Sequence, residues 1–474
     1  MKSSVLMVIF AVASASLLSV AQPSQPAQAV SASYKEAQWL PAQTPDLSTN
    51  TAWWAAYDDL QLNELEQQLS ASNMELKVAE SRFQQARSLI AMNRAAEAPT
   101  ISVSPSIDNI RYSANRPYFS PSMVNGGTGA FTLPFDLSYE VDLWGRIHKM
   151  VAAARDQAQA SAADLANVRL ILEAELAFDY FDLRKVDAEG DLLKKIVADS
   201  EQMLAIEQDL FDGGVISQDE LSAAKENLET ARVKSEEINV KRAQDEHAIA
   251  VLIGKEPAQF ALAEVSNHEL SVPDISVGVP SLLLERRPDI ASQQRLVAAA
   301  NEQIGIAHTA YYPSFTLSAE AGLQGTTLWN WMNWPSRFWA IGGQLTQTLF
   351  DGGRRKANTA LAQEQYDREV ANYRQTVLQA FREVEDELAS LRALQTEHER
   401  QLSAMQDARD RLEITKVRLD AGMNTRMNLL VADLQVYTDQ LDMIEIEKRQ
   451  LQSSVILVKA TGGGWNASQL STIQ

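Results

Sequence analysis

The chain repeats one pattern at an interval close to half its length of 474 residues. The run Asp142–Arg146 opens a proline-free stretch that ends at Gly214, and Asp351–Arg354 opens another that ends at Gly422. The lag is 208 residues at both ends, counted from the final arginines of the two runs and from the two glycines. A repeat of this kind predicts one structure made of two tandem halves rather than two or three separate domains.

The two proline-free stretches have the composition of very long helices. Lys356–Ala421 contains neither Gly nor Pro, and Ile147–Asp212, of equal length, contains only Gly190. At about 1.5 Å per residue each helix would be ~100 Å long, far beyond the ordinary length of roughly 11–12 residues. Ser217 and Thr425 are expected to cap returning helices. The predicted hairpins pair helix 146–212 with helix 216–253, and helix 355–420 with helix 425–460.

Ahead of each long helix lie segments whose side chains alternate in polarity. Every odd-numbered residue from Phe131 to Leu143 is apolar or aromatic, and Ser314–Gln324 largely repeats the alternation. This period predicts strands with one face in an apolar medium and the other in water. The acidic residues expected to face a water-filled lumen are Asp136, Glu140, Asp142 and Glu320. The four predicted strands cover residues 100–113, 129–142, 314–325 and 338–350.

A soluble β-sandwich would also show this alternation, but the aromatic residues favour an outer-membrane β-barrel, in which they would form an interfacial girdle. They are Tyr112, Tyr118, Phe119, Trp329, Trp331, Trp334 and Trp339. Four strands are too few to close a barrel around a pore. Three chains would supply twelve strands, so the sequence predicts a homotrimer in contact with outer membrane lipid.

The N-terminus has the features of a secretory signal peptide. Lys2 precedes an apolar run, Val5–Val20, and Ala27–Ala29 is a suitable cleavage site, with Ala21 as an earlier alternative. The chain contains no Cys, so an acylated N-terminal cysteine is excluded and a lipid anchor is not expected. The sequence therefore predicts export to the outer membrane, with a part that extends into the periplasm.

Composition and motifs argue against several other functions. The net charge of −20 argues against nucleic acid as a partner. Without Cys, and with five scattered His, no metal or cofactor is expected. No phosphate-binding loop, serine-hydrolase elbow or zinc-protease motif is present, so the chain is not expected to be an enzyme. A structural coiled coil is disfavoured by the alternating strands, and a periplasmic enzyme would require a compact soluble monomer.

The second half of the chain contains a set of motifs whose sequence and spacing are specific enough to indicate a protein family. The set consists of Leu283–Ile290 (LLERRPDI), Ala298–Ala300, Ile304-Gly305 and Tyr312–Ser314. With these motifs the chain resembles the outer membrane factor (TolC-like) family, in particular its efflux branch. The resemblance implies a mainly α fold with a membrane β-barrel, namely a trimeric twelve-stranded barrel, a long α-helical periplasmic tunnel and an equatorial belt. It also implies a periplasmic adaptor protein and an inner-membrane efflux pump as partners.

The same resemblance places the glycine turns at a periplasmic tip, where the adaptor docks and the tunnel closes. The docking residues it implies are Gly214, Val215, Ser217, Gly422, Met423 and Thr425. The gate candidates are Asp219, Glu220, Arg426, Met427 and Asn428. Family members often have constricting carboxylates at positions that match Asn428 or Val431, and this chain has none. Met427 is the apolar alternative, while Asp219, Glu220 and Arg426 are candidates either for interhelix ion pairs or for solvated turn residues.

The predicted organisation has six parts. They are a signal peptide (1–29), an N-terminal segment on the belt (30–61), a first repeat (62–254), an equatorial crossover (255–285), a second repeat (286–460) and a C-terminal tail (461–474). For Arg286 and Arg287 a structural role in the belt is favoured over contact with a transported compound. The expected function is a passive exit duct for drugs, detergents or other small toxic compounds, and the alternative is an exit duct for type I protein secretion.

Overall fold

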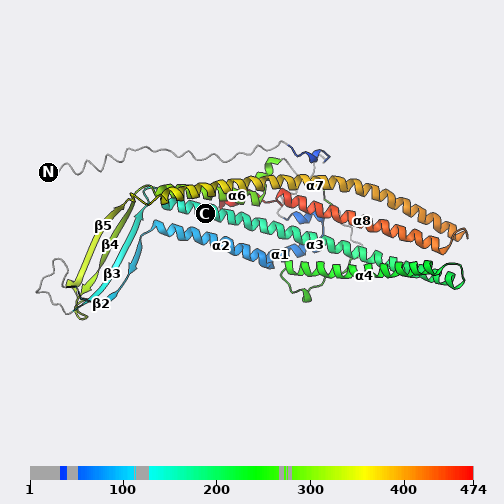
Figure 1. The fold of residues 1–474 in the computed structure, drawn as a ribbon, viewed down its shortest axis with the longest axis horizontal. Coiled ribbons are helices and arrows are strands. Elements are labelled where there is room, and N and C mark those ends of the chain that lie inside the picture. Colours follow the sequence, from blue (N-terminus) through cyan, green and yellow to red (C-terminus); the bar gives the residue numbers. More distant parts are fainter. Residues whose placement is uncertain are drawn as a thin grey trace.

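The computed structural model describes residues 33–39, 52–111, 113, 127–265, 272–273, 275 and 280–472. The expected signal peptide and three members of the aromatic set, Tyr112, Tyr118 and Phe119, lie outside these residues. The protein is elongated, with a β-sheet at one end and two helical hairpins that extend to the opposite end (Figure 1). Among the described residues, no helix combines the length and the apolar character needed to cross a membrane.

Eight α-helices form the long axis of the described chain. The first half contains α1 (Leu60–Ser72), α2 (Met74–Arg94), α3 (Arg146–Asp212) and α4 (Gln218–Leu252). The second contains α5 (Leu283–Arg286), α6 (Pro288–Thr309), α7 (Arg354–Asp420) and α8 (Arg426–Thr461). The two long helices, α3 and α7, have 67 residues each. Their equal length reflects the repeat found in the sequence.

Gly190, the one glycine inside the long stretches, does not interrupt α3. It is buried, and a Cβ at this position would lie 3.8 Å from the Ile238 side chain of α4. The first helix of the repeat is divided instead at Asn73, whose side chain accepts from the amide of Leu76 and donates to the Leu252 carbonyl. Asn73 thus caps α2 and joins it to the end of α4.

In the part of the chain that the structure describes, five strands form one antiparallel sheet. They are β1 (Thr100–Val103), β2 (Ser106–Ile110), β3 (Thr128–Val141), β4 (Ser314–Gly325) and β5 (Arg337–Thr346). The sheet order is β1-β3-β4-β5, with β2 also paired to β3. The first predicted strand is therefore two short strands along β3, divided at Pro105, because proline has no amide hydrogen for a strand ladder. The last strand ends at Thr346 rather than at residue 350.

The register places the alternating residues of neighbouring strands on common faces. Phe135 of β3 lies opposite Val103 of β1 and Ala321 of β4, and Ala321 lies opposite Trp339 of β5. On the other face Asp136 lies opposite Glu320. One apolar face and one polar face therefore continue across the sheet.

The core lies midway along the helices, where the two halves of the chain meet. Trp53, Tyr57 and Phe181 pack there with residues of α7 and α8, and all three are almost fully buried. The Tyr57 hydroxyl lies 2.6 Å from the Ser454 hydroxyl of α8. Two backbone amides of the N-terminal segment, those of Lys35 and Glu36, donate to the carboxylate of Glu385 in α7 over 2.8 and 3.0 Å. Segments from both ends of the chain thus form this belt.

Candidate functional site: the duct wall and its tip

The two hairpins have the same turn at the end farthest from the sheet (Figure 1). Gly214 has φ +72° and Gly422 has φ +74°. After α3, the amide of Val215 donates to the Leu210 carbonyl over 2.8 Å. After α7, the amide of Met423 donates to the Arg418 backbone carbonyl, also over 2.8 Å. These are Schellman turns, in which glycine adopts the left-handed conformation without a Cβ clash.

Side-chain caps begin both returning helices, as expected for Ser217 and Thr425. The Ser217 hydroxyl accepts from the amide of Glu220, and the Glu220 carboxylate accepts in return from the Ser217 amide over 2.7 Å. The hydrogen bonds that the Ser217 amide and hydroxyl donate to the carboxylate lower the pKa of Glu220. Thr425 accepts from the amide of Asn428. Glu220 therefore has a capping role, which fixes the geometry of its own turn.

Two interpretations were open for Asp219, Glu220 and Arg426, namely interhelix ion pairs and solvated turn residues, and within the described residues of the single chain Arg426 forms no ion pair with Asp219 or Glu220. Arg426 instead donates to the Gln202 side chain of α3 over 2.9 Å, which joins the second hairpin to the first. Asp199 of α3 and Asp433 of α8 lie close enough to interact. Burial and the Asp433 carboxylate raise the pKa of Asp199, while the positive charge of Arg426 opposes the rise. Met427 is partly buried and Asn428 is exposed.

The four acidic residues of the strand region have different environments. Asp136 and Glu320 form a cross-strand pair on the polar face. Glu140 forms an ion pair with Arg146 over 2.7 Å. The Asp142 carboxylate accepts from the amide of His148 in the first turn of α3 over 2.9 Å. Glu140 and Asp142 thus stabilise the junction between strand and long helix, and their charges are partly compensated.

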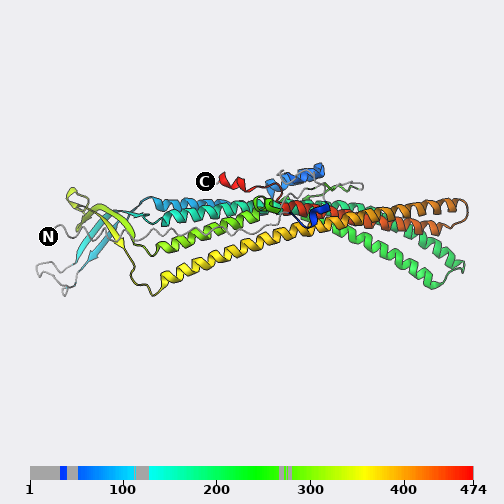
Figure 2. The same cartoon turned by 90° about the horizontal axis from the view of Figure 1, so that it is seen from above.

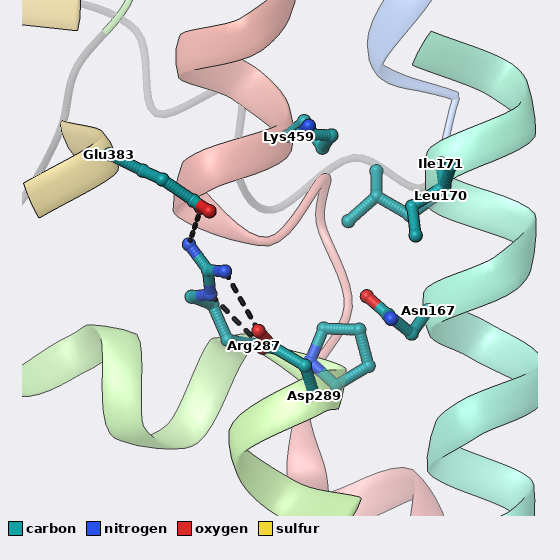
Figure 3. Close-up of a pocket in the computed structure, with 8 residues that line it drawn as sticks. Asn167, Leu170, Ile171, Arg287, Asp289, Glu383 and Lys459 are labelled. Atoms are coloured by element: carbon teal, nitrogen blue, oxygen red, sulfur yellow. Dashed lines mark hydrogen bonds and ion pairs between the residues drawn. The ribbon is translucent and has the colours of Figure 1, made fainter. Parts of the chain in front are cut away.

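Arg287 of the sequence signature joins three helices at the belt. Figure 3 shows its guanidinium between Glu383 of α7 and Asp289 of α6. The distances are 2.7 Å to Glu383 and 2.8 Å to Asp289, and Arg287 also donates to the Ala460 carbonyl of α8 over 3.1 Å. The small cavity beside it, about 140 Å³ in volume, is also lined by Asn167 and Lys459. Such contacts support a structural role for Arg287.

Sequence reasoning missed the buried charges of α3. Arg184 and Asp187 pair over 2.9 Å with 1% of each side chain exposed, and Arg242 of α4 binds Asp187 over 2.7 Å. The Arg184 and Arg242 side chains also donate to carbonyls of the crossover, those of Ala263 and Leu262. An Arg and an Asp three positions apart within an apolar helical stretch were the available signal.

A second charged cluster links α3 to both returning helices. Asp182 lies 3.3 Å from Lys241 of α4 and 3.7 Å from Lys448 of α8. Beside it, burial, Glu175, Asp245 and Asp182 raise the pKa of Asp179 to about 7. Burial and Asp182 raise the pKa of Asp245 to about 6. Among the described residues no group of His, Asp and Glu is arranged to hold a metal ion.

Comparison with known proteins agrees with this architecture. The profile of the family described as "Outer membrane efflux protein" matches residues 65–255 and 279–463. The toluene efflux pump outer membrane protein TtgF of Pseudomonas putida is 29% identical over 437 residues, which cover 92% of this chain and 90% of that protein. Outer membrane protein OprJ of Pseudomonas aeruginosa is 28% identical over 436 residues, covering 90% of this chain and 89% of OprJ.

Solved structures show the same fold. The Campylobacter jejuni CmeC outer membrane channel aligns with a TM-score of 0.84 at 25% identity, covering 94% of each chain. The open state of the Neisseria gonorrhoeae MtrE outer membrane channel aligns with a TM-score of 0.78 at 22% identity, covering 94% of this chain and 98% of that chain. The predicted fold class, mainly α with a membrane β-barrel and a helical tunnel, is confirmed by these likenesses.

Proposed function

Because this chain belongs to the outer membrane efflux protein family, we propose that it is the outer-membrane exit duct of a tripartite efflux system. In this function it conducts small toxic compounds passively, after an inner-membrane pump and a periplasmic adaptor have delivered them. The observation that carries the proposal is the continuity of the fold. A sheet with one apolar and one polar face leads directly into two hairpins built on helices of 67 residues.

A homotrimer is the assembly that completes the duct. In the described residues the sheet has two free edges, β5 on one side and β1 with β2 on the other. These edges run in opposite directions, so β5 of one chain can pair in antiparallel fashion with β1 and β2 of the next. Near the sheet α7 lies apart from the other helices (Figure 2), and its exposed Leu361 is available for contact with a neighbouring chain. Three copies close the barrel with twelve strand positions.

The tip is the proposed docking and closing point. Val215 and Met423 follow the two turn glycines, and they are 70% and 69% exposed, respectively. Exposed apolar side chains on rigid turns suit contact with an adaptor protein. Arg426 is the best supported of the gate candidates because its hydrogen bond to Gln202 joins the two hairpins. Efflux-pump relatives favour small compounds over the proteins of type I secretion as cargo.

Complementation tests the proposed function. A strain from which the gene has been deleted should become sensitive to toluene, bile salts, dyes and antibiotics, and the intact gene should restore resistance. Purified protein in a planar bilayer should form a channel without any energy source. If the deletion strain kept its resistance to all these compounds but no longer exported a type I secretion substrate, the efflux assignment would be contradicted. The secretion alternative would then be supported.

A further inference from the structure

The loop that joins β4 to β5 has an unusual surface. It contains Trp329, Trp331 and Trp334, and Trp339 follows in β5. Trp329 is 88% exposed, Trp334 is 77% exposed and Trp339 is 73% exposed. Residues 326–337 include no Asp or Glu, although the chain has 62 acidic residues, and their one charge belongs to Arg337. The conduction of solutes does not require such a surface.

The loop folds onto the apolar face of the sheet. Gly325 lies opposite Phe131 in the register, so a Cβ at Gly325 would point to the same face as the Phe131 ring. That Cβ would lie 2.7 Å from the Trp331 Cα. The rings of Trp331 and Phe131 are 6.1 Å apart. The loop therefore covers the rim of the apolar face rather than the opening of the barrel.

Internal contacts hold the loop in one conformation. The Ser336 hydroxyl donates to the Asn330 carbonyl over 2.6 Å, and the Ser336 amide donates to Asn333 over 3.0 Å. The Arg337 guanidinium carbon lies 4.0 Å from the centre of the Trp334 ring. Arg337 is opposite Leu323 and thus also belongs to the apolar face. A stacked guanidinium keeps most of its donors available for an anion.

We propose that this loop binds the phosphate-bearing lipid headgroups of the outer leaflet. Arg337 would bind the phosphate, while Trp329, Trp334 and Trp339 would lie at the boundary between headgroups and acyl chains. Three features indicate a lipid as the occupant. The patch continues the lipid-facing side of the barrel, its charge is complementary to phosphate, and tryptophan favours the membrane interface. The outer leaflet follows from the loop's position at the end of the sheet away from the helices (Figure 1).

This inference rests on the orientation in the proposed function, but it does not depend on the cargo. The full-length trimer in detergent can be titrated with lipid A and with its dephosphorylated form, and binding measured by native mass spectrometry. We expect the phosphorylated lipid to bind roughly tenfold more tightly, the effect of one charge-assisted hydrogen bond. R337Q should abolish this preference, and R337K should keep much of it. W334A should weaken the binding of both lipids.

The matched control is R382Q on α7, because Arg382 is outside the barrel and its side chain is 69% exposed. This variant should bind both lipids as the wild type does. Equal binding of the two lipids by the wild type, or unchanged binding by R337Q, would overturn the proposal. Equally tight binding of phosphatidylglycerol, a lipid of the inner leaflet, would overturn the assignment to the outer leaflet. Failure of these binding tests would leave drug resistance intact, so it is distinguishable from failure of the efflux function.

Discussion

Asp136 and Glu320 lie directly opposite each other on adjacent strands, on the polar face of the sheet. Two carboxylates in a directly paired position repel each other unless water or cations screen them. Their placement is understandable if this face lines a water-filled passage. Threefold repetition would bring six such carboxylates to one level of the barrel.

The first prediction is a preference for cations over anions. In a planar bilayer with a salt gradient, the reversal potential of the wild-type channel should have the sign of cation selectivity. The double variant Asp136→Asn, Glu320→Gln should move this potential toward zero. Asp136→Glu, which keeps the charge, should leave it close to the wild-type value. Anion selectivity of the wild type would contradict the assignment of the polar face to the lumen.

The second prediction concerns the two faces of β3. Leu137→Arg should place a charge in lipid at a cost of roughly 2–4 kcal/mol near the bilayer midplane. Asp136→Arg, one residue away on the other face, should be tolerated. The measurement is the yield of heat-modifiable trimer in outer-membrane extracts. If both variants assembled to the same extent, the assignment of the faces would be wrong.

The third prediction separates the backbone of the tip from its surface. A Cβ at Gly214 or Gly422 would meet no atom within 4 Å, so a larger side chain projects from the turn. Gly422→Ala should destabilise the hairpin by about 1–2 kcal/mol through left-handed strain alone and keep efflux. Gly422→Trp should have the same strain, assemble as a trimer and abolish drug resistance, because it obstructs adaptor docking. Normal resistance with the Trp variant would remove this turn from the docking surface.

The fourth prediction concerns closure of the tip. Arg426→Glu removes the hydrogen bond to Gln202 and places a third carboxylate beside Asp199 and Asp433. Repulsion between the hairpins should raise single-channel conductance and sensitivity to large antibiotics. Gln202→Ala, which removes only the hydrogen bond, should have a smaller effect in the same direction. Unchanged conductance in both variants would show that another contact holds the tip closed.

The fifth prediction is a pH dependence of stability. Burial and neighbouring carboxylates raise the pKa of Asp179 from 3.8 to about 7, and the ion pairs of Lys241 and Lys448 with Asp182 lie beside it. A carboxyl with a raised folded pKa binds more protons in the native state, so stability should fall as pH rises toward 7. The thermal midpoint of the trimer, measured roughly one to two pH units on either side of the pKa of Asp179, should therefore be lower on the alkaline side than on the acidic side. Asp179→Asn should flatten this decrease, whereas Glu399→Gln, at an exposed position of α7, should not.

A similar argument applies to the buried pair in the belt. Glu66 is fully buried, and burial together with Glu173 raises its pKa well above the ordinary value. Burial raises the pKa of Glu173 to about 7, although Arg169 opposes the rise. Both groups therefore add to the expected fall in stability as the pH rises toward their raised pKa values.

Local features of the sequence were sufficient for much of the fold. The absence of Pro, and of every Gly except Gly190, predicted α3 and α7, since helix propensity acts within a few residues. The alternation along β3 and β4 predicted which side chains share a face. Pro105 was present in the sequence, but the division of the first strand also depends on the pairing of both pieces with β3. Local sequence patterns therefore predicted which helices and strands form more accurately than the residues at which they begin and end.

Contacts between distant residues could not be predicted in this way. Arg426 and Gln202 are 224 positions apart, and Arg287 and Glu383 are 96 positions apart. Nothing in the local sequence of Arg426 distinguishes Gln202 from the nearby carboxylates as its partner. The charge pattern of α4 was equally compatible with an ion pair and with the cap that Glu220 forms.

The contact of Glu385 with the N-terminal segment has a consequence for the order of folding. Glu385 accepts from the amides of Lys35 and Glu36, which precede it by 350 and 349 residues. During export the N-terminal segment emerges first, yet its partner in α7 follows only after most of the chain. Contacts of such wide separation form slowly because a large loop must close. The hairpins can therefore form early from neighbouring residues, while the belt is completed last and marks a finished protomer.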